Sequence, residues 1–460
     1  MFVAFLAACF LLGGSARADV TQLVLLRPLG WLFVGYALVV GSREDFAQVR
    51  APLLLLGALG ILLLVQVVPL PPAIWTSLPT HSLVETVAAQ AGLGDVWRPI
   101  SLLPGATANA LFSLGVPLAA ILLVAIQSPE YRRKVWTVVL VIALVSALLG
   151  LAQLFGGRGS PLYFYPIANV GSPIGFFANR NHHGVFLAAM VVVACGRIAQ
   201  QSLQRDRRSS SIVLPAAVAM LAVPVLLASE SRAGILALAL AAIAGGYLLV
   251  SSGAVPPKLR LGRRASIPTG LAMFGVVIAA VAAFALLFLM AGGMAADEMA
   301  GLTDESYDLR FQVLPTVAQM AVDALPMGIG VGAFTTVYAI YEPDGMVEAR
   351  YLNHAHNDWL QPVIELGAGG LIIGLALFAW MAARGVRTWR LADKADRLAS
   401  LIAWVVLAIL ILASAVDYPL RAPALMAVAG IAAAMCCLRD PTRSLSRKSK
   451  RSSVPKEFAE

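Results

Sequence analysis

The sequence predicts an all-α polytopic membrane protein with about 12 transmembrane helices. Two observations predict this fold class. Of the 460 residues, 59% are hydrophobic and only 13% are charged, and the mean hydropathy is +0.82, whereas a soluble chain carries about a quarter charged residues. The apolar residues also occur in blocks of roughly 17 to 25, which is the length that a helix needs to cross the hydrocarbon core.

Each apolar block gives the expected centre of one helix, with an error of several residues at either end. The blocks cover residues 2–14, 22–41, 51–70, 108–127, 135–156, 182–199, 212–229, 233–250, 268–291, 361–383, 399–416 and 422–438. The first block is followed by Ala16-Arg17-Ala18, which is similar to a signal-peptidase site. Because no positive charge precedes this block, we expect an uncleaved first helix.

The distribution of basic residues predicts the orientation of the helices. Most of the 34 Lys and Arg residues fall in alternate connections and in a basic tail, residues 439–460. The positive-inside rule then places both termini in the cytoplasm. Two long segments lie on the outer side of the membrane in this topology, a first loop at 69–107 and a larger loop at 292–360 between the ninth and tenth helices. The net charge of +9 follows from this topology and does not indicate nucleic-acid binding.

The motifs of several enzyme classes are missing from the sequence. The four cysteines lie in apolar blocks without a CxxC pair or a histidine at metal-binding spacing, so we expect them to pack as small apolar residues. No Asp-x-Asp motif is present to hold the metal of a nucleotide-sugar transferase, and no GxSxG motif is present. We therefore expect neither a metal nor a cofactor.

Polar residues that could carry chemistry gather at the predicted outer ends of the helices, where charges are costly unless paired or used. The segments are Asn179-Arg180-Asn181-His182-His183, Ser229-Glu230-Ser231-Arg232, the loop around Arg310, His354-Ala355-His356-Asn357-Asp358 and Asp417-Tyr418-Pro419-Leu420-Arg421. Arginine forks bind phosphate oxygens at any physiological pH, and fixed cations stabilise a departing pyrophosphate. A neutral histidine can accept the proton of an attacking hydroxyl.

His356 is the predicted general base, because a polar pair and then an apolar helix follow it. The alternative is an interfacial histidine that water and headgroups solvate. On a helix, His354 would point about 200° away from His356, so the two could not face one substrate. On an extended loop they could share a face, as zinc ligands would, although no third ligand is evident.

Four arginines are candidates for substrate binding: Arg180, Arg232, Arg310 and Arg421. Each has an alternative role at the membrane surface or in an ion pair. Glu230 is the alternative partner of Arg232, and carboxylates in residues 304–308 are the alternative partners of Arg310.

These motifs resemble the O-antigen ligase and polymerase family, also called the Wzy C-terminal superfamily. Residues 354–371 are similar to its His-Asn-x-x-Leu-x-x-x-x-Glu-x-Gly segment, and Ser231-Arg232-Ala233-Gly234 resembles its Ser-Arg-Gly/Ala block. Residues 179–182, 326–334 and 417–421 also look like family segments. The resemblance covers most of the chain and is most specific in its C-terminal two thirds.

The resemblance implies a multi-pass protein of the bacterial inner membrane whose two long outer loops, 69–107 and 292–360, face the periplasm. It also implies a metal-independent, inverting transfer of saccharide from undecaprenyl pyrophosphate to an acceptor hydroxyl in the periplasm. It assigns the base to His356 and donor binding to Arg232, with Arg310 and Arg421 as weaker assignments; Arg180 and His354 complete the expected binding site. The acceptor of such an enzyme is lipid A core, a glycan or a protein, and a repeat-unit polymerase of O-antigen or exopolysaccharide shares the same motifs.

A transporter or flippase of lipid-linked saccharide is the alternative from another class. Such proteins also need about 10 to 14 helices, but they commonly show paired repeats and helices broken near the midplane. The sequence has no clear internal repeat, and its charges lie at the outer rim, which favours chemistry at the surface. A structural component of a polysaccharide machine is a third interpretation.

Overall fold

The computed structural model describes residues 1–460 except 204–209, 256–257, 262–264, 269–311, 348–351 and 439–460. Within the described residues, nine helical spans are long and apolar enough to cross a membrane. They are α2 (Gln22–Val40), α4 (Arg50–Val67), α7 with α8 (Pro104–Ser113 and Gly115–Ala125), α9 (Pro129–Gly156), α10 (Arg180–Ser202), α11 (Ser210–Ala228), α12 (Arg232–Ser252), α18 (Ala368–Trp389) and α19 (Lys394–Ala413). Two shorter apolar helices, α1 (Phe2–Leu12) and α20 (Pro423–Cys437), pack among them. The predicted all-α polytopic fold class is confirmed.

The helices differ from the predicted blocks mainly at their ends. α9 and α19 begin several residues early, because Pro129 stands in the first turn of α9 and the Asp393 carboxylate caps α19. The block at 361–383 is broken into α17 (Gln361–Leu366) and α18 at Gly367, which has φ of +62°. A Cβ there would lie 2.1 Å from the Pro326 carbonyl oxygen, so only glycine fits. The predicted ninth helix, 268–291, lies outside the described residues except for Pro268.

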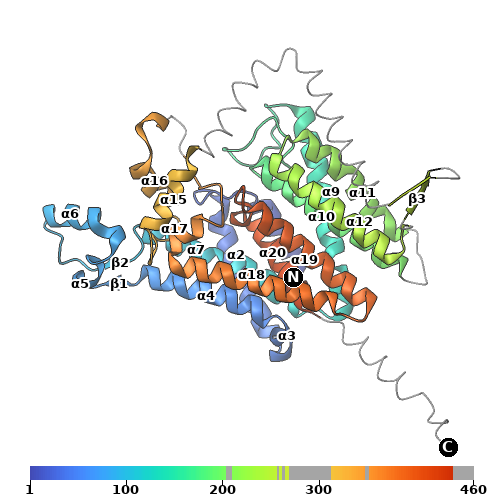
Figure 1. The fold of residues 1–460 in the computed structure, drawn as a ribbon, viewed down its shortest axis with the longest axis horizontal. Coiled ribbons are helices and arrows are strands. Elements are labelled where there is room, and N and C mark those ends of the chain that lie inside the picture. The colour runs from blue at the N-terminus through green and yellow to red at the C-terminus, as the bar shows by residue number, and fades with distance from the viewer. Residues whose placement is uncertain (204–209, 256–257, 262–264, 269–311, 348–351, 439–460) are drawn as a thin grey trace, which may run out of the picture.

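Short elements occupy the two predicted outer segments. Residues 69–103 form β1 (Pro69–Leu70), α5 (Pro72–Trp75), the 3₁₀ turn η1 (Pro79–His81), α6 (Ser82–Gln90) and β2 (Arg98–Pro99), with β1 and β2 antiparallel. The described part of 292–360 forms α15 (Leu314–Asp323), α16 (Phe334–Tyr341) and the 3₁₀ turn η2 (Asp344–Met346). The Leu102 amide donates to the Ile329 carbonyl at 2.9 Å, so the two segments meet at one end of the bundle (Figure 1). A second two-stranded ribbon joins β3 (Lys258–Leu261) to β4 (Ala265–Pro268).

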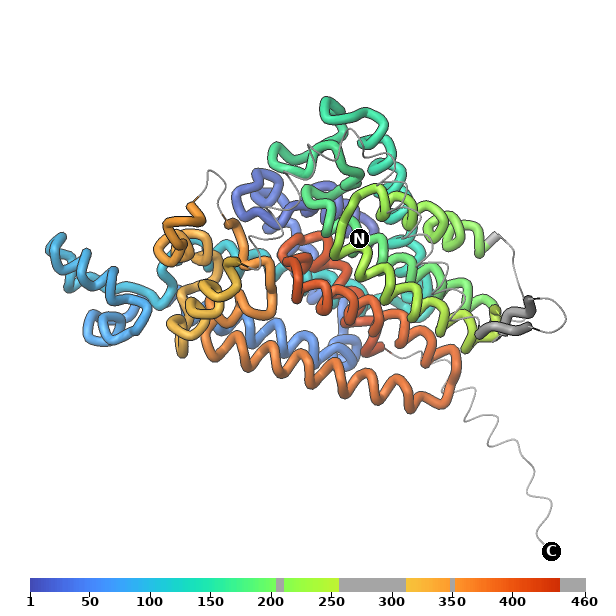
Figure 2. Tube along the Cα trace, turned by 45° about the horizontal axis from the view of Figure 1, so that its top comes forward, coloured from blue at the N-terminus to red at the C-terminus, as the bar shows by residue number. Residues whose placement is uncertain are grey.

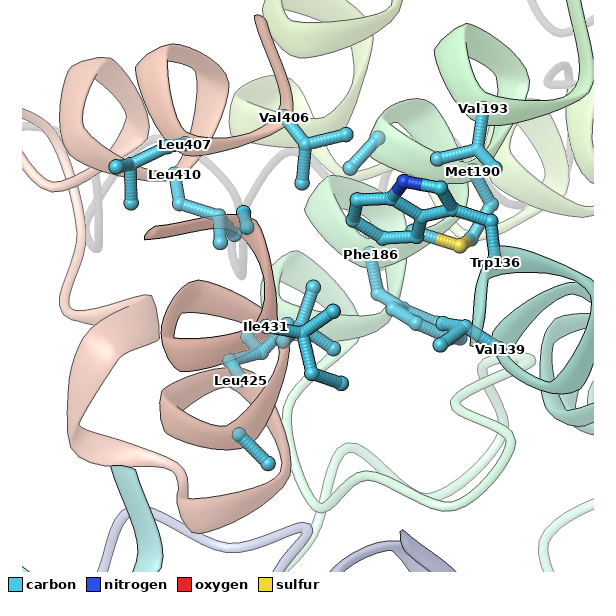
Figure 3. Close-up of a cluster of buried hydrophobic side chains, with 14 of the residues drawn as sticks. Trp136, Val139, Phe186, Met190, Val193, Val406, Leu407, Leu410, Leu425 and Ile431 are labelled. Carbon is cyan, nitrogen blue, oxygen red and sulfur yellow. The ribbon is translucent and has the colours of Figure 1, made fainter. Parts of the chain in front are cut away.

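α10 forms the centre of the bundle. In its apolar 18-residue stretch 89% of the residues are buried, whereas the corresponding fraction is 17% for α4 and for α18. α4 and α18 run side by side along one face of the bundle (Figure 2). Figure 3 shows part of the core around α10, where side chains of α9, α19 and α20 also meet. The labelled side chains are Trp136, Val139, Phe186, Met190, Val193, Val406, Leu407, Leu410, Leu425 and Ile431.

Two glycines bring the starts of α10 and α12 together. A Cβ on Gly184 would lie 3.1 Å from the Cα of Gly234, so the backbones touch where neither residue has a side chain. The Ser231 hydroxyl caps α12 and donates to Asn181 Oδ1 at 2.9 Å. Consequently the first residues of the two helices lie at the same end of the bundle.

Candidate active site

The loop that carries the two predicted histidines is held by the side chain of Asn357. Its Oδ1 accepts hydrogen bonds from the amides of Trp359 at 2.9 Å and Leu360 at 3.0 Å, which fixes the turn before α17. His356, the residue before it, has φ of +50°. Such left-handed backbone is uncommon outside glycine and tends to occur at functional sites.

Arg421 anchors this loop to a turn further along the chain. It lies in the 3₁₀ turn η3 (Pro419–Arg421), and its Nε donates to Asp358 Oδ1 at 2.7 Å while its Nη2 donates to Glu365 Oε2 at 3.2 Å. The two carboxylate side chains are 9% and 2% exposed. Burial raises the pKa of Asp358 to about 6, although Arg421 opposes this shift. The short contact with the Arg421 guanidinium favours the ionised form of this carboxyl.

The other carboxylate oxygen of Glu365, Oε1, connects Arg421 to the histidine loop. Glu365 Oε1 accepts from Gln361 Nε2 at 3.0 Å and from the Gly332 amide at 3.1 Å. Gln361 Oε1 accepts in turn from the Ala355 amide at 2.9 Å, and its Nε2 lies 3.4 Å from His354 Nδ1. The network fixes the backbone between the two histidines from the α17 side.

Three histidine rings surround Tyr418. The ring centroids of His182, His354 and His356 lie 5.2, 4.4 and 4.9 Å from that of Tyr418. His354 and His356 thus lie on a loop and share a face, which corrects the helix-based expectation that they point apart. In the described part of the chain, no group of three or more His, Cys, Asp or Glu residues has the geometry of a metal site.

The surroundings of His356 and His354 differ. His356 Nδ1 lies 3.8 Å from Oδ1 of Asp417, whose side chain is only 1% exposed. Burial, with Arg421 and the other histidines nearby, holds the pKa of His354 well below its ordinary value. A ring with such a low pKa is a weak base at neutral pH. The carboxylate beside His356, together with the low pKa of His354, favours His356 over His354 for proton transfer.

Of the other predicted arginines, two stand at helix starts and one is not described. Arg180 and Arg232 begin α10 and α12. Glu230, the sequence-based alternative partner of Arg232, has an oxygen 3.7 Å from Nη1 of Arg180. Arg310 lies outside the described residues.

Comparison with known proteins shows what the chain is similar to. The family model described as O-antigen ligase matches residues 216–379. The resemblance drawn from the motifs is thereby confirmed. The chain is also 26% identical to a probable peptidoglycan glycosyltransferase FtsW of Alkalilimnicola ehrlichii over 350 residues, which cover 70% of this chain and 75% of that protein. Together the two likenesses support a membrane glycosyltransferase.

The O-antigen ligase match contains Arg232 and the histidine loop, whereas Arg180 and Arg421 lie outside it. Sequence reasoning missed two residues that the structure adds to this site, His182 and Tyr418. His182 is 1% exposed, and neither of its ring nitrogens has a hydrogen-bond partner among the described residues. The available signal was its place in Asn179-Arg180-Asn181-His182, but only the fold brings that segment to Tyr418.

Proposed function

We propose that the chain transfers a saccharide from undecaprenyl pyrophosphate to an acceptor hydroxyl at the periplasmic face of the bacterial inner membrane. The observation that carries this proposal is the position of His356. Its ring lies beside a buried carboxylate at the end of the bundle where α10 and α12 begin with arginines. A base and a set of cations are the two groups that this reaction needs.

His356 removes the proton of the acceptor hydroxyl. The acceptor oxygen forms a bond to the anomeric carbon, the bond from that carbon to the pyrophosphate oxygen breaks, and the configuration inverts. Asp417 stabilises the imidazolium that forms, as a buried carboxylate does behind other catalytic histidines. The 3.8 Å separation is longer than a hydrogen bond, and such contacts commonly shorten when substrate binds.

Arg232 and Arg180 stabilise the departing undecaprenyl pyrophosphate. Both begin helices, so their guanidinium groups act together with the positive ends of two helix dipoles. Arg421 is better suited to positioning, because two carboxylates already neutralise it. No step requires a metal or a cofactor.

The acceptor decides between two related activities. A ligase attaches the polymer to lipid A core or to a protein, whereas a polymerase extends a glycan. The likeness to a probable peptidoglycan glycosyltransferase is the observation that favours a glycan acceptor as the second candidate.

The polysaccharide profile of a deletion strain tests both activities. Accumulation of complete lipid-linked polymer with loss of its attachment indicates a ligase, and accumulation of single lipid-linked repeat units indicates a polymerase. Transfer by the purified protein in liposomes would distinguish either enzyme from a flippase. An unchanged profile together with no transfer in vitro would contradict the proposal.

A further inference from the structure

A second polar site lies at the opposite end of the bundle from the histidines. A cavity of about 210 Å³ opens where α9 and α19 begin and where α10, α18 and α20 end. Arg197 in its wall is 17 residues along α10 from Arg180, which corresponds to about 25 Å at roughly 1.5 Å per residue. The cavity is therefore separate from the proposed active site.

Five arginines from three helices line this cavity, against one carboxylate, Asp396. The arginines are Arg132 and Arg133 of α9, Arg197 of α10, and Arg384 and Arg387 of α18. Gln200, Thr388 and Ser400 add neutral polar groups to the lining. Orientation in the membrane accounts for basic residues near these helix ends, but it does not require them to converge on one concave cavity.

Arg197 and Arg384 keep hydrogen-bonding capacity for a ligand. A guanidinium has five N–H donors, and each hydrogen bond described here uses one of them. Arg132 Nη2 donates to the Ala125 carbonyl at 2.8 Å, and Arg197 Nη1 donates to Gln200 Oε1 at 2.9 Å. Arg384 Nη2 donates to the Cys436 carbonyl, but its buried Nε has no acceptor in the described part of the chain.

We propose that this cavity binds a phosphate group through Arg132, Arg197 and Arg384. Several arginine forks around one space are the donor arrangement that phosphate oxygens prefer. The volume is below the roughly 300 to 1,000 Å³ typical of pockets for drug-sized ligands, which fits a phosphate group better than a nucleotide. The same chemistry has two sources, the headgroup of an anionic phospholipid and a free phosphate ion. Basic pockets between helices hold phospholipid headgroups in other membrane proteins.

The test is binding by the purified full-length protein after delipidation. Native mass spectrometry with phosphatidylglycerol, and separately with phosphatidylcholine, reports the lipid source. Isothermal titration with inorganic phosphate reports the free ion. The variants are Arg197→Gln, Arg384→Gln and their combination, and the matched control is Arg390→Gln, an exposed residue of the same helix end outside the cavity lining.

We expect the wild type and Arg390→Gln to bind phosphatidylglycerol in preference to phosphatidylcholine, or to bind phosphate, with equal affinity. Each cavity variant should bind about fivefold more weakly, the effect of removing roughly 1 kcal/mol per charge. Thermal unfolding checks that the variants are folded, and the exposed Arg387→Gln replaces any that is not. Equal binding by the wild type and the cavity variants in both arms would overturn the proposal. Because the readout is binding, the result does not depend on transfer activity.

Discussion

His356 and His354 differ in function in the proposed mechanism, although both rings contact Tyr418. His356→Ala should reduce transfer by about 100-fold or more, the scale expected for loss of a general base, while donor binding persists. His354→Ala should have a milder effect, because the low pKa of that ring makes it a poor base. The measurement is saccharide transfer from undecaprenyl pyrophosphate donor by each purified variant, with EDTA added in parallel. Full activity of His356→Ala, or loss of wild-type activity in EDTA with recovery on adding zinc, would remove His356 from this role.

A substitution at Arg232 tests whether the planar shape of the guanidinium contributes to donor binding. Arg232→Lys should lose most of its transfer activity despite keeping the charge, because a point ammonium cannot bind two phosphate oxygens as a planar fork does. Arg43→Lys, an exposed arginine near the other end of the bundle, is the matched control and should remain fully active. Near-normal transfer by Arg232→Lys would contradict the donor-binding role.

At the scale of single residues, the sequence indicates the side chains of the candidate site better than it indicates their partners. The histidine loop and the arginines at helix starts were predicted because polar residues stand out at the edges of apolar blocks. The partners of Arg421 could not be predicted, since Asp358 and Glu365 are 63 and 56 residues away in the chain. Likewise, only tertiary packing brings His182 to Tyr418.

Among the elements, η3 and α17 depend on each other through Arg421. Arg421→Gln should lower kcat by more than about 10-fold with little change in the KM for the lipid donor, because the carboxylates of Asp358 and Glu365 would lose their charged partner and the loop would shift. Breaking a buried pair from one side typically costs about 3 to 5 kcal/mol, so thermal unfolding should also occur at a lower temperature. A rise in KM at constant kcat would instead assign Arg421 to donor binding.

The contact between α10 and α12 is sensitive to one added methyl group. Gly184→Ala would place a carbon 2.9 Å from Ser231 Oγ and 3.1 Å from the Gly234 Cα. We expect a destabilisation of about 1 to 3 kcal/mol, as for other overpacked sites, and reduced transfer as Arg232 moves from Arg180. Gly57→Ala in α4 is the control, since no atom lies within 4 Å of its added carbon. Equal melting temperatures for the two purified variants would disprove this account of the interface.

Hydropathy predicted the elements well wherever a helix simply spans the hydrocarbon. It did not predict the break at Gly367, because a glycine inside an apolar block looks the same whether or not another backbone approaches it. Here the Pro326 carbonyl does so. The short elements of 69–103 also escaped prediction, since their strands contain two residues each.

For the whole molecule, the proposed topology predicts which surfaces face which compartment. Ser42 and Ser77 are exposed residues beyond opposite ends of α4. A cysteine at Ser77 should react with a membrane-impermeant maleimide added to intact spheroplasts, and a cysteine at Ser42 should react only after lysis. The four native cysteines are buried, so their background labelling should be low. Labelling of both positions from the same side would reject the topology.

The burial of α10 has a consequence for how the sequence can diverge. A helix that faces lipid along most of its length can exchange one apolar side chain for another, because acyl chains adapt to any shape. α4 and α18 have this freedom, because only 17% of the residues in their apolar stretches are buried. α10, at 89%, is surrounded by protein that does not adapt. Among relatives of this chain, we therefore expect α10 to accumulate substitutions most slowly of the spans, including at positions far from any histidine or arginine.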